Sequence, residues 1–327
     1  MKVLFIGGTG TISSACTELA LRSGIDLYHF NRGQSHRKFE GVKNIKGDIR
    51  NVEESRNALK GMNFDVVVDW ICFTGEHAKA DVELFSGITG QFIFISSASA
   101  YKKPVDKLPI TEETPLENKF WEYSRNKIEC ENIFRKAHDE NRMPVTIVRP
   151  SHTYDRTLIP FEWGYTVIDR ILNGKKVVIH GDGTSLWVMT HNTDFAKGFN
   201  GLFGKKEALG EAFHITGDEL LNWNLIFRLF AEELGKDLDA IHIPSDFIDT
   251  YDNRVGSSLL GDKAHSVIFD NSKIKRLVPE FVQTVRFKDG VKEIAAWYKN
   301  NPSWCKKDEV NDKIIKLIIF DYMRCMR

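Results

Sequence analysis

The residues best suited to chemistry in this sequence are a tyrosine and a lysine four positions apart. Tyr123 and Lys127 lie in the run YSRNK, and on a helix such residues project from the same face. A phenol has an ordinary pKa of about 10, but an adjacent ammonium favours the phenolate and lowers that pKa. The pair is therefore a candidate for general acid–base chemistry, although this spacing also occurs by chance in many structural helices.

A serine-rich segment precedes this pair and supplies a second candidate group. The apolar run QFIFI at 91–95 is followed by SSASAY at 96–101. A hydroxyl such as that of Ser97, placed where a strand ends, can hold a substrate oxygen while a tyrosine moves the proton. The alternative interpretation is that these serines only cap the helix that follows.

The chain opens with a glycine cluster directly after an apolar run. VLFI at 3–6 predicts a buried strand, and GGTGTISSA at 7–15 leads into residues with helical spacing. A strand, a glycine turn and a helix begin a dinucleotide-binding βαβ unit, in which Gly7 makes the turn and Gly10 lets the backbone approach a pyrophosphate. Ser13 stands where the full fingerprint has a third glycine.

The same alternation of strands and helix-length segments continues to about residue 150. Further strands are expected at 26–30, just before 46–49, and at 65–70, 91–95 and 145–148. This pattern predicts an α/β fold with a Rossmann-type, doubly wound parallel sheet over residues 1–150. Residues 151–327 are expected to form a smaller, mainly substrate-binding region, with some segments returning to the first domain.

Composition favours an enzyme that acts on a small molecule. Lys plus Arg equals Asp plus Glu at 45 each, so no general attraction to nucleic acid or to an anionic membrane is expected. The five cysteines lack metal-type spacing, and no apolar stretch approaches the roughly 20 residues of a membrane span. We expect a reduced, cytoplasmic protein without a metal, nucleic-acid or membrane partner.

Together these motifs resemble the extended short-chain dehydrogenase/reductase superfamily, the group that includes UDP-galactose 4-epimerase and the nucleotide-sugar dehydratases. The resemblance rests on ordered motifs along nearly the whole chain. These are GGTGTIS at 7–13, GD at 47–48, FIFISSASAY at 92–101, YSRNK at 123–127, RP at 149–150, GDGTSLWVMTHNTDFAKG at 181–198 and DNSKIKRL at 270–277.

The resemblance implies a catalytic trio and a set of NAD(P) contacts. Ser97, Tyr123 and Lys127 would form the trio, and Lys127 would also hold the nicotinamide ribose. The implied cofactor contacts are Gly7, Gly10, Thr11 and Ile12 at the pyrophosphate, Asp48 and Ile49 at the adenine, and Ile71 and Cys72 beside the ribose. Relatives pair through helices that include the segment of Tyr123, so a homodimer is also implied.

The residue that ends the second strand distinguishes NAD from NADP. A carboxylate at this position binds the adenosine ribose of NAD, whereas this chain has Asn31 followed by Arg32. Arg37 and Lys38 follow closely, and such positive charge suits a 2′-phosphate. The sequence therefore favours NADP, and the alternative is that Asn31 serves NAD through its amide while the basic residues lie in a solvated loop.

Two departures from the family pattern bear on the reaction and the substrate. Dehydratases of the family carry an acidic pair after the catalytic hydroxyl, where this chain has Ala98 and Ser99, so hydride chemistry as in an epimerase or a reductase is expected. Trp187 stands where epimerases have an arginine for the substrate diphosphate, which leaves a sugar or a nucleotide sugar as the substrate. The candidate substrate contacts are Ser99, Tyr154, Trp163 and Trp187, whose aromatic members serve equally well as core residues.

A different class of function is the main alternative. In its missing arginine, the segment 181–198 resembles the chloroplast stem-loop RNA-binding members of the superfamily, which have lost the usual catalytic tyrosine. This chain keeps both Tyr123 and Lys127 and has balanced charge. The enzyme is therefore favoured over an RNA-binding protein or a cofactor sensor without turnover.

Overall fold

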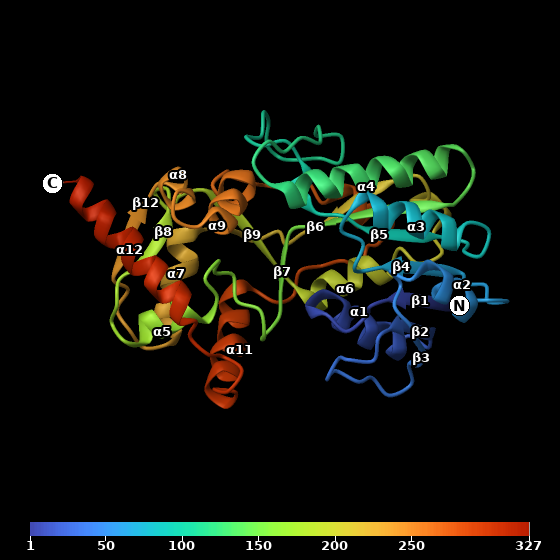
Figure 1. The fold of residues 1–327 in the computed structure, drawn as a ribbon, viewed down its shortest axis with the longest axis horizontal. Helices are drawn as coiled ribbons and strands as arrows, with labels where there is room; N and C mark the ends of the chain where they lie inside the picture. Colours follow the sequence, from blue (N-terminus) through green and yellow to red (C-terminus); the bar gives the residue numbers. More distant parts are fainter. Residues whose placement is uncertain (327) are drawn as a thin grey trace.

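Seven parallel strands form the sheet that organises the first lobe (Figure 1). The computed structural model describes residues 1–326. The strands of this sheet are β1 (Lys2–Ile6), β2 (Asp26–Asn31), β3 (Lys43–Lys46), β4 (Val66–Asp69), β5 (Phe92–Ile95), β6 (Val145–Pro150) and β10 (Ala212–Ile215). They lie in the order β10-β6-β5-β4-β1-β2-β3. The predicted Rossmann-type, doubly wound sheet is confirmed.

The strands are apolar along their length because helices cover both faces of the sheet. One face carries α1 (Thr11–Arg22), α6 (Asn192–Asn200) and α10 (Ser272–Leu277), and the other carries α2 (Val52–Ala58), α3 (Gly75–Phe85) and α4 (Glu122–Asp139). Successive side chains of a strand point to opposite faces. In β1, Val3 and Phe5 accordingly join one hydrophobic core, whereas Leu4 and Ile6 join the other.

The order of the strands reverses beside β1, and the candidate functional residues lie at this point of the sheet. The chain runs from β1 outward through β2 to β3 and then crosses to β4 on the other side of β1. In such sheets ligands bind at the carboxyl ends of the strands, at this point of reversal. Gly7 follows β1, Cys72 follows β4 and Ser97 follows β5, so all three lie at the same edge.

The second lobe is built from small sheets and helices (Figure 1). β7 (His152–Tyr154), β9 (Leu186–His191) and β11 (Leu220–Asn222) form one sheet, and β8 (Val177–His180) pairs with β12 (Ala240–Ile243). The helices are α5 (Tyr165–Leu172), α7 (Trp223–Glu233), α8 (Ser245–Asp249), α9 (Asn253–Ser258), a π-helical turn at Leu259–Lys263, α11 (Phe287–Asn300) and α12 (Glu309–Cys325). Short 3₁₀ turns lie at Ala98–Ala100 and Lys206–Ala208. None of the helices within residues 1–326 has the length and hydropathy of a membrane span.

A buried aspartate of α12 forms an ion pair with α5 of the second lobe. Asp312 is 1% exposed; it accepts a hydrogen bond from Arg170 at 2.5 Å and forms ion pairs with Lys316 at 2.9 Å and Lys307 at 3.2 Å. Burial alone would raise the pKa of Asp312, but the bonds from its three cationic partners hold it well below its usual value.

We expect Asp312→Asn to destabilise the protein in a pH-dependent way. At pH 7 the loss should be about 1–3 kcal/mol, because hydrogen bonds to a charged group are replaced by neutral ones. A depressed pKa stabilises the folded state above the unfolded pKa of about 4, and this contribution is lost as the pH falls. In thermal unfolding, the difference in Tm between wild type and Asp312→Asn should therefore be clear at pH 7 and become smaller below about pH 4. A Tm difference that stays constant with pH would contradict the role given to the ionised Asp312.

Candidate functional site

The glycine turn after β1 brings the backbone close to its neighbours. The Gly7 amide donates to the Phe30 carbonyl at 3.0 Å, and Gly7 and Gly8 have φ values of +97° and +89°. A Cβ atom on Gly8 would lie 2.6 Å from Nε2 of His29, so only glycine fits there. The turn therefore leaves no side chain between the backbone and a ligand at the start of α1.

Ser13 explains how the turn forms without the third glycine of the fingerprint. Its hydroxyl accepts a hydrogen bond from the Gly10 amide at 2.8 Å, and the side chain is buried. This hydrogen bond stabilises the start of α1, because it gives the Gly10 amide an acceptor. The first-turn residues Thr11 and Ile12 are partly exposed at the positive end of the helix, where backbone amides attract a phosphate.

A cavity of about 520 Å³ lies beside this turn. Among the predicted cofactor residues, Gly7, Asn31, Arg32, Asp48, Ile49 and Ile71 line it. The cavity and the glycine turn lie at the carboxyl ends of the strands, where sheets of this kind bind a dinucleotide.

Phe73, His77 and Arg50 are among the residues of the cavity that sequence reasoning missed. The Phe73 amide donates to Nδ1 of His77 at 3.2 Å. Arg50 donates to the carbonyl of Ile71. All three follow the carboxyl ends of β3 and β4, and that position was the signal that could have identified them.

The basic residues predicted to surround a 2′-phosphate do not lie in one place in the structure. Arg32 is exposed at the cavity and makes no ion pair within residues 1–326. Arg37 turns away: it donates to Ser14 at 2.9 Å and pairs with Asp155 at 3.3 Å. The prediction for Arg37 is therefore wrong, because an acid of the second lobe already holds its charge. Asn31 uses its carbonyl oxygen to accept from the Gly33 amide at 2.8 Å.

Lys127 lies in the interior, directly behind the cavity. It is 2% exposed, and Nζ donates to the carbonyls of Cys72 at 2.6 Å and Ile95 at 2.8 Å. Nζ also lies 4.7 Å from the centroid of the Phe73 ring. Burial lowers the pKa of Lys127. The lysine thereby ties α4 to the ends of β4 and β5, and Cys72 takes part through its carbonyl rather than its thiol.

Tyr123 lies one helical turn before Lys127 and beside Ser97. Burial raises the pKa of Tyr123 to about 12, although a hydrogen bond with Ser97 acts to lower it. Nζ of Lys127 is 5.7 Å from the centroid of the Tyr123 ring. The expected lowering by the ammonium is therefore wrong for this structure, because Nζ faces two backbone carbonyls and burial dominates. At neutral pH the phenol holds its proton.

Ser97 belongs to a chain of hydroxyls. Its Oγ lies 2.8 Å from Oγ of Ser99, which accepts from Ser124 at 2.7 Å. Ser97 also accepts from the Ser99 amide at 3.2 Å, so it caps the short turn at 98–100 as well. Ser99 is 3% exposed. It supports the Ser97 hydroxyl from behind rather than facing a substrate, which corrects its predicted role.

A buried ion pair fixes the helix that carries Tyr123 and Lys127. Arg149, in the RP motif at the end of β6, pairs with Glu131 of α4 at 2.6 Å, and both side chains are at most 1% exposed. Glu131 also accepts from Ser96 at 2.6 Å. Because Ser96 precedes Ser97, this network holds the end of β5 and α4 in one arrangement.

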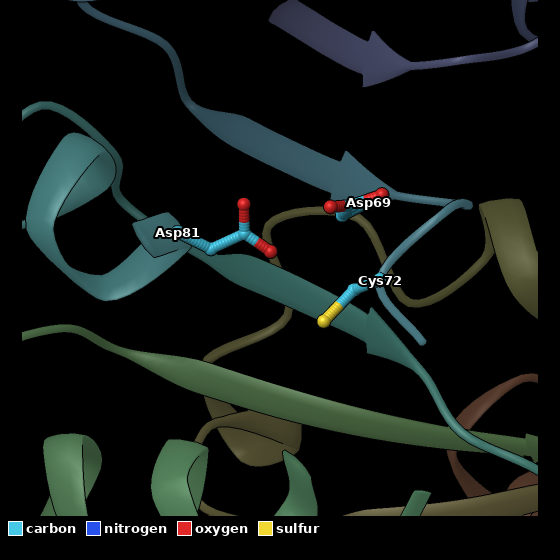
Figure 2. A group of neighbouring side chains, drawn as sticks. All are labelled: Asp69, Cys72 and Asp81. Carbon is cyan, nitrogen blue, oxygen red and sulfur yellow. The ribbon is translucent and has the colours of Figure 1, made fainter. Parts of the chain in front are cut away.

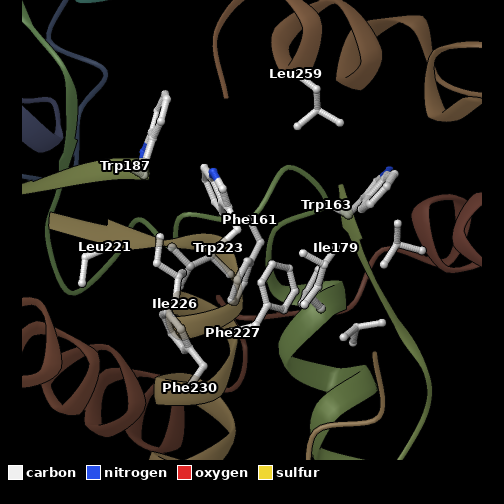
Figure 3. Packing of buried hydrophobic residues seen from close by; sticks show 14 of the residues in the cluster. Phe161, Trp163, Ile179, Trp187, Leu221, Trp223, Ile226, Phe227, Phe230 and Leu259 are labelled. Atoms are coloured by element: carbon white, nitrogen blue, oxygen red, sulfur yellow. The ribbon is translucent and has the colours of Figure 1, made fainter. Parts of the chain in front are cut away.

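The aromatic residues predicted to stack on a substrate lie in the core of the second lobe. Figure 3 shows two of them, Trp163 and Trp187. Tyr154 and Trp187 are 0% and 1% exposed, and Trp187 packs against Trp223 with ring centroids 5.4 Å apart. Trp163 is 5% exposed and donates to Asp252 at 3.1 Å. Their packing corrects the stacking role: all three rings are covered by other side chains.

Comparisons with known proteins agree with this geometry. A family model described as "NAD dependent epimerase/dehydratase family" matches residues 3–215. The chain is 24% identical to the chloroplast stem-loop binding protein of 41 kDa b of Arabidopsis thaliana, over 72% of this chain and 63% of that protein. It is 28% identical to a dTDP-glucose 4,6-dehydratase of Actinoplanes sp., over 66% of this chain and 62% of the relative. These matches thus span less than two thirds of either relative.

Solved structures of similar fold cover nearly the whole chain. The UDP-glucuronic acid 4-epimerase of Bacillus cereus, in complex with UDP-glucuronic acid and NAD, has a TM-score of 0.74 at 21% identity, over 92% of this chain and 99% of that one. The dTDP-glucose 4,6-dehydratase of Bacillus anthracis, in complex with NAD, has a TM-score of 0.75 at 21% identity, over 93% and 98%. Both confirm the fold.

Proposed function

We propose a hydride-transfer function on one premise: the chain belongs to the NAD dependent epimerase/dehydratase family. The protein is an NAD(P)-dependent epimerase or reductase that acts on a hydroxyl or carbonyl group of a sugar or a nucleotide sugar. One observation carries this proposal. Ser97, Tyr123 and Lys127 lie together near the carboxyl end of β5, and Lys127 packs against Phe73, a residue that lines the cavity.

Each residue of the trio has a distinct role in the proposed reaction. The dinucleotide, when bound, supplies the hydride donor or acceptor. Ser97 holds the substrate oxygen, and Tyr123 moves the proton on that oxygen. The raised pKa of Tyr123 suits the donation of a proton to a carbonyl as it is reduced. Lys127 would hold the ribose of a bound dinucleotide with the third N–H of its ammonium, since the other two donate to the Cys72 and Ile95 carbonyls.

The segment after β5 restricts the type of reaction. Ala98 is 3% exposed and Ser99 supports Ser97, so the place where family dehydratases carry an acidic pair offers no acid or base for elimination. The proposal therefore excludes dehydration. It is tested by incubating the protein with NAD or NADP and a panel of UDP- and dTDP-sugars, and by following the reduced nicotinamide and any epimer. Elimination of water as the main reaction would refute it.

We further propose NADP as the preferred cofactor, with Arg32 as its phosphate ligand. Arg32 lies exposed at the adenosine end of the cavity. We expect Arg32→Glu to weaken NADP binding about tenfold or more, since a hydrogen bond to a charged group is worth about 1.5–3 kcal/mol. NAD binding should stay within about twofold.

Lys60→Glu is the matched control for Arg32→Glu, because Lys60 is also an exposed basic residue of the first lobe but lines neither this cavity nor the adjoining one at Asn31 and Gly33. Titration of each variant with both dinucleotides measures the effect. Equal loss of NAD and NADP binding, or no loss of either, would overturn the NADP proposal.

RNA binding is the second candidate, because one relative is named a chloroplast stem-loop binding protein. Electrostatic binding to RNA weakens steeply as salt rises. The hydride-transfer proposal predicts that the purified protein holds no RNA at low salt. Retained RNA that is lost as salt rises, together with a failure to bind either dinucleotide, would favour this second candidate.

A further inference from the structure

Two buried carboxyl groups lie together beneath the turn that follows β4. Figure 2 shows Asp69 at the end of β4, Asp81 on α3 and the Cys72 side chain near both. One carboxyl oxygen of each aspartate and the Cys72 sulfur all lie within 4.8 Å of one another. All three residues are 0% exposed. The proposed reaction uses none of these side chains, so their presence in the interior needs its own explanation.

Among the residues that the structure describes, no cation forms an ion pair with Asp69 or Asp81. Oδ1 of Asp69 accepts from the Ile71 amide at 2.6 Å, whereas Oδ2 of Asp69 and both Asp81 oxygens are buried without a hydrogen-bond partner. The Lys127 ammonium is committed to two backbone carbonyls. The Arg50 guanidinium binds the Ile71 carbonyl. Two buried carboxylates so close together, with no cation bonded to either, do not both ionise.

We propose that Asp69 and Asp81 share one proton, with the Asp81 hydroxyl donating to the Asp69 carboxylate, and that this bond holds the turn 70–72 in place. Asp69 then stays ionised and fixes the Ile71 amide. The next residue, Cys72, presents its carbonyl to Lys127 at 2.6 Å. Asp81 is thus a positioning residue that acts on Lys127 through the turn.

The surroundings of the pair support a shared proton. Burial, followed by the charge of Asp69, raises the pKa of Asp81 well above its usual value. The other titratable groups that face the pair are Cys72, Arg50 after β3, His77 on α3, and Lys127 and Cys130 on α4. The Cys130 sulfur lies 4.0 Å from that of Cys72, and that contact together with burial raises the pKa of the Cys72 thiol. The thiol therefore stays neutral and adds no charge.

The competing occupant of the cluster is a divalent metal ion. Two carboxylates and a thiolate are suitable ligands for zinc, and the cluster offers three such donors. A proton satisfies the same oxygens with one charge and needs no fourth ligand. Metal analysis of the purified protein separates the two, because a stoichiometric metal that disappears in Asp81→Asn would overturn the shared proton.

The proton itself can be observed without any assay of activity. We expect a carbonyl stretching band of a protonated carboxylic acid in the infrared difference spectrum between wild type and Asp81→Asn at neutral pH. In this variant the new side-chain amide would replace the hydroxyl as donor to Asp69, so the protein should fold normally. The absence of such a band, in a folded variant, would refute the proposal.

The pH dependence of stability gives a second test. A carboxyl group with a raised pKa in the folded state stabilises that state at low pH, and the contribution is lost as the pH rises from about 4 through the folded pKa. Relative to Asp81→Asn, the unfolding equilibrium constant of wild type should rise about tenfold per pH unit from about pH 5 up to the folded pKa of Asp81. A ratio that is flat with pH would contradict a proton bound only in the folded state.

The effect on Lys127 rests on the proposed function and is tested separately. Asp81→Leu removes the donor and leaves Asp69 buried and unpaired, so we expect weaker dinucleotide binding than in wild type by about tenfold or more. Asp81→Asn should restore it to within about threefold. If the infrared band is present but both variants bind the dinucleotide like wild type, the shared proton stands and the positioning role is wrong. If wild type itself binds no dinucleotide, the proposed function fails instead.

Discussion

Tyr123→Phe should lower turnover by about 10²–10⁴-fold, the usual contribution of a general acid or base. The substitution removes only the phenolic oxygen that lies beside Ser97. The ring keeps its contact with Trp121, whose centroid lies 4.9 Å away. Dinucleotide affinity should therefore stay within about twofold. Turnover is measured by the change in nicotinamide absorbance or by the epimer formed, and affinity by calorimetric titration.

Tyr298→Phe is the matched control for this substitution. Tyr298 lies on α11 in the second lobe, away from Ser97 and Lys127. The loss of its hydroxyl should leave turnover unchanged. A Tyr123→Phe protein that remains as active as this control would remove Tyr123 from the mechanism.

Lys127→Met should reduce both affinity and turnover. The substitution keeps a long apolar chain but leaves the carbonyls of Cys72 and Ile95 without their donor, at a cost of about 1–3 kcal/mol for each buried group left unpaired. It also removes the proposed ribose contact and the positive charge near Tyr123. We expect dinucleotide affinity to fall about tenfold or more and turnover about 10²-fold or more.

The contrast between the two variants is the informative result. Tyr123→Phe should separate turnover from binding, whereas Lys127→Met should lower both. Lys127→Arg should not restore activity, because a planar guanidinium does not fit a site built around an ammonium with two carbonyl acceptors. Cofactor binding that is unaffected in Lys127→Met would assign this lysine a purely structural role.

The sequence predicted the parallel sheet because its signals are local. The apolar run before Gly7 and the glycines that follow it already specify a buried strand and a tight turn. The alternation of strands with helix-length segments then leaves one sheet topology in practice. The proposed trio of Ser97, Tyr123 and Lys127 was predicted from the family resemblance, and the structure brings its members together.

Contacts between distant segments were not predictable in this way. Arg37 meets Asp155, which lies 118 residues later in the chain, so its own loop gave no sign that its charge was engaged. Tyr154 and Trp187 follow turns and polar residues, yet the second lobe closes over both. Whether an aromatic side chain lines a site or fills a core depends on tertiary packing, which no single segment encodes.

Burial also reversed the direction of the pKa shift that the sequence predicted for Tyr123. The spacing of Tyr123 and Lys127 predicted a lowered tyrosine pKa, but the direction depends on where Nζ points and on the loss of water around the phenol. Asp81 is similar, since an aspartate in a polar helical stretch is typical of a solvent-facing position. Its burial against Asp69 follows only from the docking of α3 on β4.

The most direct test of the central claim is a calorimetric titration of the purified protein with NAD and with NADP. The account predicts one dinucleotide bound per chain, tighter binding of NADP than of NAD, weaker binding in Lys127→Met and unchanged binding in Tyr123→Phe. Failure of the folded protein to bind either dinucleotide would contradict the hydride-transfer function and the assignment of the cavity beside the glycine turn.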